Sequence, residues 1–117
     1  MKRNHEEAAI QRAIIKWARL NVYRYPVLRW LHAIPNGDKR DARTAAMLKA
    51  EGVTSGILDL FLPYPTMGSP YTDTWYGLYM EIKTPTGRLS AAQKEFLEYA
   101  RAAGYATYVA RTAQSGI

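Results

Sequence analysis

The sequence contains no cysteine and only two histidines, His5 and His32. The lack of cysteine excludes disulfide scaffolds, cysteine-ligated zinc, iron–sulfur clusters and thiol catalysis, and it is typical of a protein of the reducing cytoplasm. Two histidines are too few for a multi-histidine metal site. We interpret His32 as structural, with a position beside a cleft as the alternative.

Long apolar runs are also missing. The longest, over residues 56–63, is too short to span a bilayer, and the N-terminal residues 1–7 lack the apolar stretch of a signal peptide. We therefore expect neither secretion nor a membrane role. Acidic residues are few: the chain has ten Asp and Glu and sixteen Lys and Arg, which gives a net charge of +6. This balance favours a polyanionic partner, nucleic acid first, although excess lysine can also serve solubility alone.

The length of 117 residues, 48% of them hydrophobic, predicts a single domain over 1–117. Periodicity, caps and turn residues predict the elements in order. These are a helix over 6–20, a strand over 29–33, a helix capped by Asp38 that ends near residue 50, two strands over 56–63 and 75–84, a helix from the cap Ser90 to about residue 103, and a strand over 105–111. The two middle strands are expected to pair as a hairpin. The predicted fold class is α/β, a mixed central sheet flanked by helices.

Three charged residues in these middle strands carry the candidate chemistry. Asp59 lies inside an apolar strand, where a carboxylate needs a compensating partner. Glu81 and Lys83 are two residues apart and share one face of the next strand. If the strands are neighbours, the two carboxylates can converge on a divalent cation, with Lys83 beside them to orient a water molecule. The alternative is a structural ion-pair network on a solvated sheet face.

Two further residues are candidates for the same pocket. Glu7 lies on or beside the core-facing stripe of the first helix, although an acidic residue in a first turn is also favoured by the helix dipole. Gln93 follows Ser90 by three positions, which is the spacing of a capping box, and its amide could still reach a phosphate or a water molecule.

Basic and aromatic residues offer a second set of contacts. The basic side chains predicted to contact phosphate groups are Lys39, Arg40, Arg43, Lys49 and Arg88, with Lys83 in the pocket. For the aromatic residues we expect packing in the core or in interfaces, with base stacking as the alternative for some. That set comprises Tyr23, Tyr25, Trp30, Tyr64, Tyr71, Trp75 and Tyr76.

These motifs, taken in order, resemble the VRR-NUC domain, a branch of the PD-(D/E)xK nuclease superfamily with its restriction-endonuclease-like core. The resemblance spans almost the whole chain. It rests on Glu7-Ala-Ala-Ile-Gln11, Lys16-Trp17-Ala18-Arg19, Ala33-Ile-Pro-Asn-Gly37, Leu48-Lys-Ala-Glu-Gly-Val53, Gly56-Ile-Leu-Asp59-Leu60, Glu81-Ile-Lys83-Thr-Pro-Thr-Gly87, Leu89-Ser-Ala-Ala-Gln93 and Gly104-Tyr105. Leu58 stands where the superfamily has the proline of its name, and since that proline is not a ligand, we expect the chemistry to be kept.

The resemblance implies a metal-dependent DNA endonuclease. Asp59, Glu81 and the main-chain carbonyl of Ile82 would hold Mg²⁺ or Mn²⁺, and Lys83 would position the attacking water. By the same match Glu7 and Gln93 complete the pocket. Stand-alone members of the family, found in phages and bacteria, are similar to Holliday-junction resolvases, which implies a homodimer on four-way DNA junctions in the cytoplasm of a bacterial or phage-infected cell.

Two other functions stay open at this point. One is a non-catalytic, basic DNA-binding module in which the three charged strand residues are structural. The other is an interaction subunit whose aromatic side chains serve a protein interface.

Overall fold

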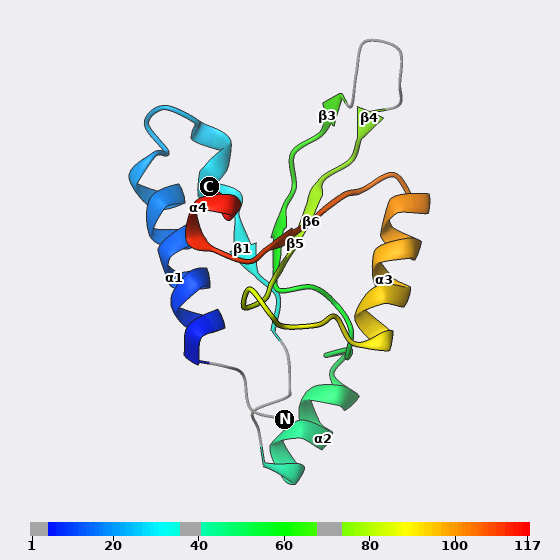
Figure 1. Cartoon of the computed structure of the whole chain (residues 1–117). Coiled ribbons are helices and arrows are strands. Elements are labelled where there is room, and N and C mark those ends of the chain that lie inside the picture. The colour runs from blue at the N-terminus through cyan, green and yellow to red at the C-terminus, as the bar shows by residue number, and fades with distance from the viewer. Residues whose placement is uncertain (1–4, 36–40, 68–73) are drawn as a thin grey trace.

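The computed structural model describes residues 5–35, 41–67 and 74–117. Its centre is a four-stranded sheet with the strand order β1-β2-β5-β6. The strands are β1 (His32–Ala33), β2 (Leu60–Leu62), β5 (Leu78–Ile82) and β6 (Ala106–Ala110). β2 is antiparallel to both β1 and β5, whereas β6 runs parallel to β5. The predicted mixed sheet flanked by helices is therefore confirmed (Figure 1).

Helix α1 (His5–Leu20) covers one face of the sheet. Ile14 and Ala18 lie one helical turn apart and are almost fully buried. They pack in one cluster with Leu60 and Ile82 of the sheet. Burying an isoleucine or leucine side chain contributes about 1.5–3 kcal/mol, so this stripe fixes the helix against the strands. The helix predicted over 6–20 is confirmed.

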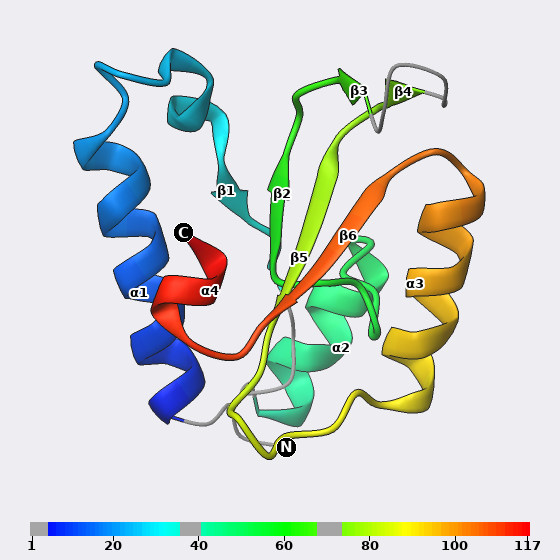
Figure 2. The same cartoon turned by 45° about the horizontal axis from the view of Figure 1, so that its top comes forward.

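Helix α3 (Ala91–Ala102) lies on the opposite side of the sheet from α1 (Figure 2). A capping box sets its first turn: Ser90 Oγ accepts a hydrogen bond from the Gln93 N–H (3.1 Å), and Gln93 Oε1 accepts one from the Ser90 N–H (2.9 Å). Its end is followed by Gly104, whose φ of +97° is in the left-handed region that glycine adopts readily. The helix predicted from the cap Ser90 and the strand after it are both confirmed.

The strand predicted over 29–33 is wrong in most of its length. Residues Pro26–Trp30 form a 3₁₀ helix, η1, and only His32–Ala33 pair with β2 as β1. Proline is favoured in the first turn of a helix, where its missing N–H needs no partner. Arg19 of α1 also donates hydrogen bonds to carbonyls of this segment, which ties it to the helix instead of the sheet.

The second helix begins later than predicted. α2 (Ala42–Ala50) follows Asp41, whose side chain accepts a hydrogen bond from the Thr44 N–H (2.8 Å). The cap is therefore Asp41, and the predicted cap Asp38 lies outside the described residues. Both aspartates precede helix-forming residues, so the local sequence alone does not decide between them.

The predicted hairpin of β2 and β5 is confirmed, but both strands are shorter than expected. Trp75, the first residue of the predicted strand over 75–84, belongs to a separate pair, in which β4 (Thr74–Trp75) is antiparallel to β3 (Thr66–Met67). A short C-terminal helix that was not predicted, α4 (Ala113–Gly116), packs against α1. Among the described residues no helix is both long and apolar enough to cross a membrane.

Candidate active site

The hairpin register brings two acidic side chains together. Leu60 of β2 lies opposite Met80 of β5, and both are buried in the core beneath α1. Because side chains alternate along a strand, Asp59 and Glu81 project from the other face of the sheet, the face that α3 covers. They occupy the next cross-strand position of the same antiparallel pair.

Asp59 is held in place by two hydrogen bonds. Its Oδ2 accepts from the Ile82 N–H (2.8 Å), and its main-chain carbonyl accepts from the Ile34 N–H (2.8 Å). The side chain thus takes the place of a main-chain partner for Ile82 just where β2 begins. This arrangement directs the carboxylate toward β5 before any ligand binds.

Glu81 is buried to an extent unusual for an acidic side chain, with only 2% of its surface exposed. Its Oε2 accepts a hydrogen bond from Gln93 Nε2 (2.8 Å), and the Lys83 ammonium lies 3.5 Å from the same oxygen. Its other oxygen, Oε1, is buried without a hydrogen-bond partner. Buried polar atoms are nearly always paired, so this oxygen is satisfied either by a proton shared with Asp59 or by a bound cation.

The pKa of Glu81 is strongly raised. Burial is the largest cause and the neighbouring Asp59 carboxylate is the second; together they raise this pKa to about 8, and the Lys83 ammonium opposes them only in part. Glu81 is therefore largely protonated at neutral pH in the metal-free protein, and ionising it takes more positive charge than Lys83 supplies, such as that of a bound cation. The alternative of a structural network on the sheet face stays open on these contacts alone. Strongly perturbed acids of this kind are typical of functional sites.

Gln93 joins α3 to the acidic pair. One end of its amide completes the capping box with Ser90, and the other end donates to Glu81. The loop before Asp59 packs closely on the same helix turn, because a Cβ built at Gly56 would lie 2.8 Å from main-chain atoms of Ala92. Gly56 has a φ of +86°, so glycine is required both by its conformation and by this approach.

The donor set fits a hard divalent cation. Carboxylate and carbonyl oxygens are the ligands that Mg²⁺ and Mn²⁺ prefer, and Glu81 Oε1 is an oxygen in need of a positive partner. The N–H and C=O of a strand residue point to the same edge, so the Ile82 carbonyl faces the side on which Asp59 lies. The described residues contain no group of three or more acidic or histidine side chains suited to a metal ion. The remaining coordination positions of such a cation would therefore be occupied by main-chain oxygen, water and substrate.

The other predicted site residues are distributed around the pair. Glu7 is half-buried in the first turn of α1 and belongs to no three-acid group with Asp59 and Glu81. Arg43 and Lys49 are exposed on α2. Arg88 is exposed just before α3, and Lys39 and Arg40 lie outside the described residues.

Sequence reasoning missed one residue that supports the site. Arg111, which follows β6, donates from Nη1 to the main-chain carbonyls of Thr84 (2.9 Å) and Gly87 (2.6 Å). These bonds brace the turn that leads from Lys83 toward α3. No local pattern marks Arg111, because its partners are more than twenty residues away in the chain.

The family model described as the VRR-NUC domain matches residues 5–114. The chain belongs to the VRR-NUC family. A solved structure described as a VRR_NUC domain protein superposes with a TM-score of 0.74 at 24% sequence identity, over 97% of this chain and 83% of that one. A search of curated proteins found no significant match.

Membership in the VRR-NUC family confirms the resemblance drawn from the sequence motifs, and the structural neighbour confirms the fold. Membership in this family also implies a nuclease-type function for the chain. The non-catalytic and interaction-subunit alternatives are thereby disfavoured, because the VRR-NUC family is associated with nuclease activity.

Proposed function

We propose that this VRR-NUC domain is a Mg²⁺- or Mn²⁺-dependent DNA endonuclease that hydrolyses phosphodiester bonds. The observation that carries the proposal is the buried Glu81, with one oxygen unpartnered and the Asp59 carboxylate beside it. Asp59, Glu81 and the Ile82 carbonyl would hold the cation. When bound, the cation would neutralise the two carboxylates, polarise a phosphate oxygen and lower the pKa of a water molecule.

We assign the handling of the attacking water to Lys83. Its ammonium lies 3.5 Å from Glu81 Oε2 and its side chain is only 14% exposed, so its charge is screened less than a surface charge. A hydrogen bond from Lys83 would orient the water for in-line attack and stabilise the negative charge that develops on the phosphate oxygens. Gln93 keeps the Glu81 carboxylate fixed during these steps. The expected products carry a 5′-phosphate and a 3′-hydroxyl.

For the substrate we propose branched DNA, with the four-way junction first, cut by a homodimer. Support comes from the net charge of +6, which suits a substrate that presents several phosphate arms. A pair of sites related by a two-fold axis would match the symmetry of a four-way junction and allow two symmetrical nicks.

The test compares wild type with Lys83→Ala on labelled four-way junction, flap, duplex and single-stranded DNA, each with Mn²⁺ and with EDTA. Lys94→Ala is the matched control, since Lys94 is an exposed lysine on α3. We expect cleavage only with metal, a rate lowered by roughly 100-fold or more in Lys83→Ala, and an unchanged rate in Lys94→Ala.

Two outcomes would contradict the proposal. Cleavage by Lys83→Ala at the wild-type rate would remove the lysine from the mechanism. Binding that ignores metal, with all four DNA forms left intact by wild type, would favour the non-catalytic DNA-binding module.

A further inference from the structure

Positive charge is concentrated in one part of the chain. Residues 8–35 hold five Lys and Arg side chains and no Asp or Glu, so they carry +5 of the net +6. These residues form most of α1, the whole of η1 and β1. In the structure η1 lies at the C-terminal end of α1 (Figure 2), and we call residues 8–35 the basic edge.

The connection between α1 and β1 also exposes large aromatic rings. Tyr23 is 83% exposed, Trp30 56% and Tyr25 45%. The Arg24 guanidinium lies over the Tyr25 ring at 5.4 Å, and the Arg29 guanidinium lies over the Trp30 ring at 4.7 Å. We call Tyr23, Arg24, Tyr25, Arg29 and Trp30 the arginine–aromatic platform. These three rings are therefore not part of the core, and the predicted interface packing and the alternative of base stacking both stay open for them.

The platform is held firmly against α1. The Arg19 guanidinium donates to the main-chain carbonyls of Leu28 (3.1 Å), Arg29 (3.3 Å) and Leu31 (2.9 Å). Leu31 is buried in the core, and Pro26 fixes the backbone at the start of η1. Rings that are ordered before binding lose little conformational entropy when a partner stacks on them.

The platform is connected to the acidic pair through β1, which pairs with β2. Trp30 precedes Ile34 by four residues, and the Ile34 N–H donates to the Asp59 carbonyl. At about 3.3 Å per extended residue, the backbone of Trp30 lies within roughly 13 Å of that point. That is about four base-pair steps of 3.4 Å along the axis of a duplex. The carboxylates project from the face of the sheet that α3 covers, whereas the platform packs on α1, so a strand that contacts both would pass around the edge strand β1.

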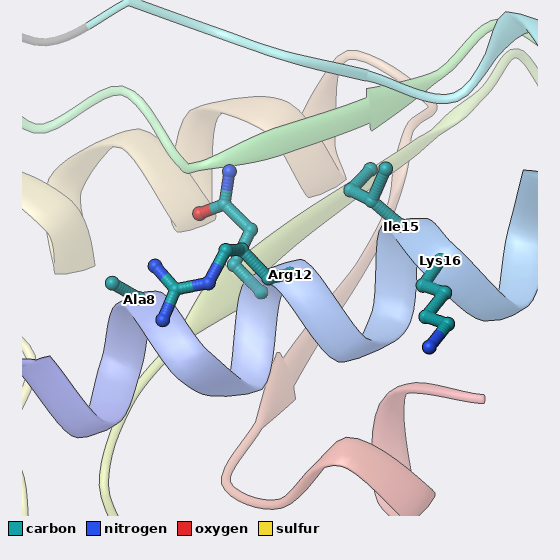
Figure 3. A pocket seen from close by; sticks show the side chains of 5 residues that line it. Ala8, Arg12, Ile15 and Lys16 are labelled. Atoms are coloured by element: carbon teal, nitrogen blue, oxygen red, sulfur yellow. The ribbon is translucent and has the colours of Figure 1, made fainter.

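A groove on α1 extends the same basic surface. It has a volume of about 430 Å³ and is lined by Ala8, Gln11, Arg12, Ile15 and Lys16. Figure 3 shows Ala8, Arg12, Ile15 and Lys16 on successive turns of the helix. Arg12 and Lys16 are exposed and one helical turn apart, a spacing that suits contacts with successive phosphate groups.

We propose that the arginine–aromatic platform stacks unpaired bases of the DNA substrate, and that Arg12 and Lys16 bind the phosphate groups that lead to them. The proposal rests on the proposed function in that it takes DNA as the substrate. Stacking on an aromatic or guanidinium plane accepts any base, so the platform would select strands with unstacked bases, as at a branch point, over a continuous duplex. A second copy of this chain is disfavoured as the partner, because it would bring a surface of the same charge to this one.

The test measures binding without cleavage, by fluorescence anisotropy in EDTA, of labelled single-stranded DNA, a four-way junction with unpaired bases at its centre, and a blunt duplex. Trp30→Ala should weaken binding of the first two by roughly 5- to 100-fold and of the blunt duplex by less than about twofold. Tyr99→Ala is the control, since Tyr99 is 65% exposed on α3, away from the basic edge, and should bind as wild type does.

A second variant separates stacking from charge. Arg12→Gln should weaken binding of all three DNA forms alike and lower the slope of log K against log salt by about 0.7–0.9, the contribution of one phosphate contact. Equal affinity of folded Trp30→Ala and wild type for single-stranded DNA would overturn the proposal. So would a change of sedimentation from dimer to monomer in Trp30→Ala, because the platform would then be a protein interface. Neither readout needs metal, so a failure of cleavage in Mn²⁺ would count against the proposed nuclease mechanism alone.

Discussion

The buried acid at the active site predicts that one substitution will stabilise the metal-free protein while abolishing its activity. The pKa of Glu81 is raised from 4.5 to about 8 by burial and by Asp59. Below pH 4.5 Glu81 is protonated in both the folded and the unfolded chain, so its raised pKa does not reduce the free energy of unfolding. Between pH 4.5 and 8 the folded protein keeps a proton that the unfolded chain releases, so stability falls as pH rises, by at most about 1.4 kcal/mol per pH unit.

Glu81→Gln removes this dependence. The amide is neutral at every pH, its oxygen can still accept from Gln93, and its NH₂ group can donate to Asp59. From pH 5 to pH 8 the wild-type loss is on the order of 3 kcal/mol. At about 4 °C per kcal/mol for a chain of this size, the variant should melt roughly 10 °C higher than wild type at pH 8, and both should melt at similar temperatures at pH 5.

The assay is thermal denaturation in EDTA from pH 5 to pH 8.5, followed by circular dichroism. Glu98→Gln, at an exposed glutamate of α3, controls for loss of a surface charge and should melt as wild type does at each pH. Added Mn²⁺ should raise the melting temperature of wild type, more at pH 8 than at pH 6 because protons compete for Glu81, and leave Glu81→Gln unchanged. A Glu81→Gln protein that melts below wild type by the same amount at pH 5 and pH 8 would refute the reasoning.

Two further substitutions test the contacts that position the acidic pair. Gly56→Ala should lower the free energy of unfolding by about 2 kcal/mol or more, because its Cβ would lie 2.8 Å from Ala92 main-chain atoms. Gly52→Ala, with a φ of +104° but nothing within 4 Å, should lower it by only about 1 kcal/mol. Urea titrations measure both values, and equal losses would contradict the close approach at Gly56. Gln93→Ala should lower the free energy of unfolding by about 1–2 kcal/mol, because the hydrogen bond that caps α3 is lost. It should also reduce the cleavage rate, because the hydrogen bond to Glu81 is lost. Gln93→Asn, whose side chain is too short to reach both partners, is the comparison variant.

The parts of the fold that the sequence predicts correctly are those specified by local signals. α1 follows from apolar residues at helical spacing, and the start of α3 follows from Ser90 and Gln93 three positions apart. The pairing of Asp59 with Glu81 follows from a hairpin between two apolar strands, where alternation leaves both carboxylates on one face. Each of these signals lies within a few residues or within one strand pair, where the rules of spacing are strict.

The parts that it does not predict depend on contacts distant in the chain. The segment over Pro26–Trp30 has no alternation of apolar and polar residues, and its helical form is fixed by Arg19, which no local rule selects as a partner. Arg111 is not predicted for the same reason, since its two carbonyl partners, Thr84 and Gly87, lie in the turn after β5, more than twenty residues away in the chain. The exposure of Trp30 is likewise set by tertiary contacts, because from the sequence alone an aromatic residue in an apolar run is expected in the core.

The basic edge and the acidic site of this VRR-NUC domain have opposite charge. We expect DNA binding to depend on the first and phosphodiester hydrolysis on the second. Under the proposed mechanism, the Asp59 carboxylate repels the phosphate that must be cut, and Glu81 adds to this repulsion above its pKa of about 8. The basic edge over residues 8–35 would attract the same strand without any metal. We therefore expect affinity for DNA in EDTA to come from α1 and η1, whereas the cation would offset the acidic charge and supply the chemistry at the phosphate. The excess positive charge of the chain would thus compensate for an active site that repels its substrate until a cation binds.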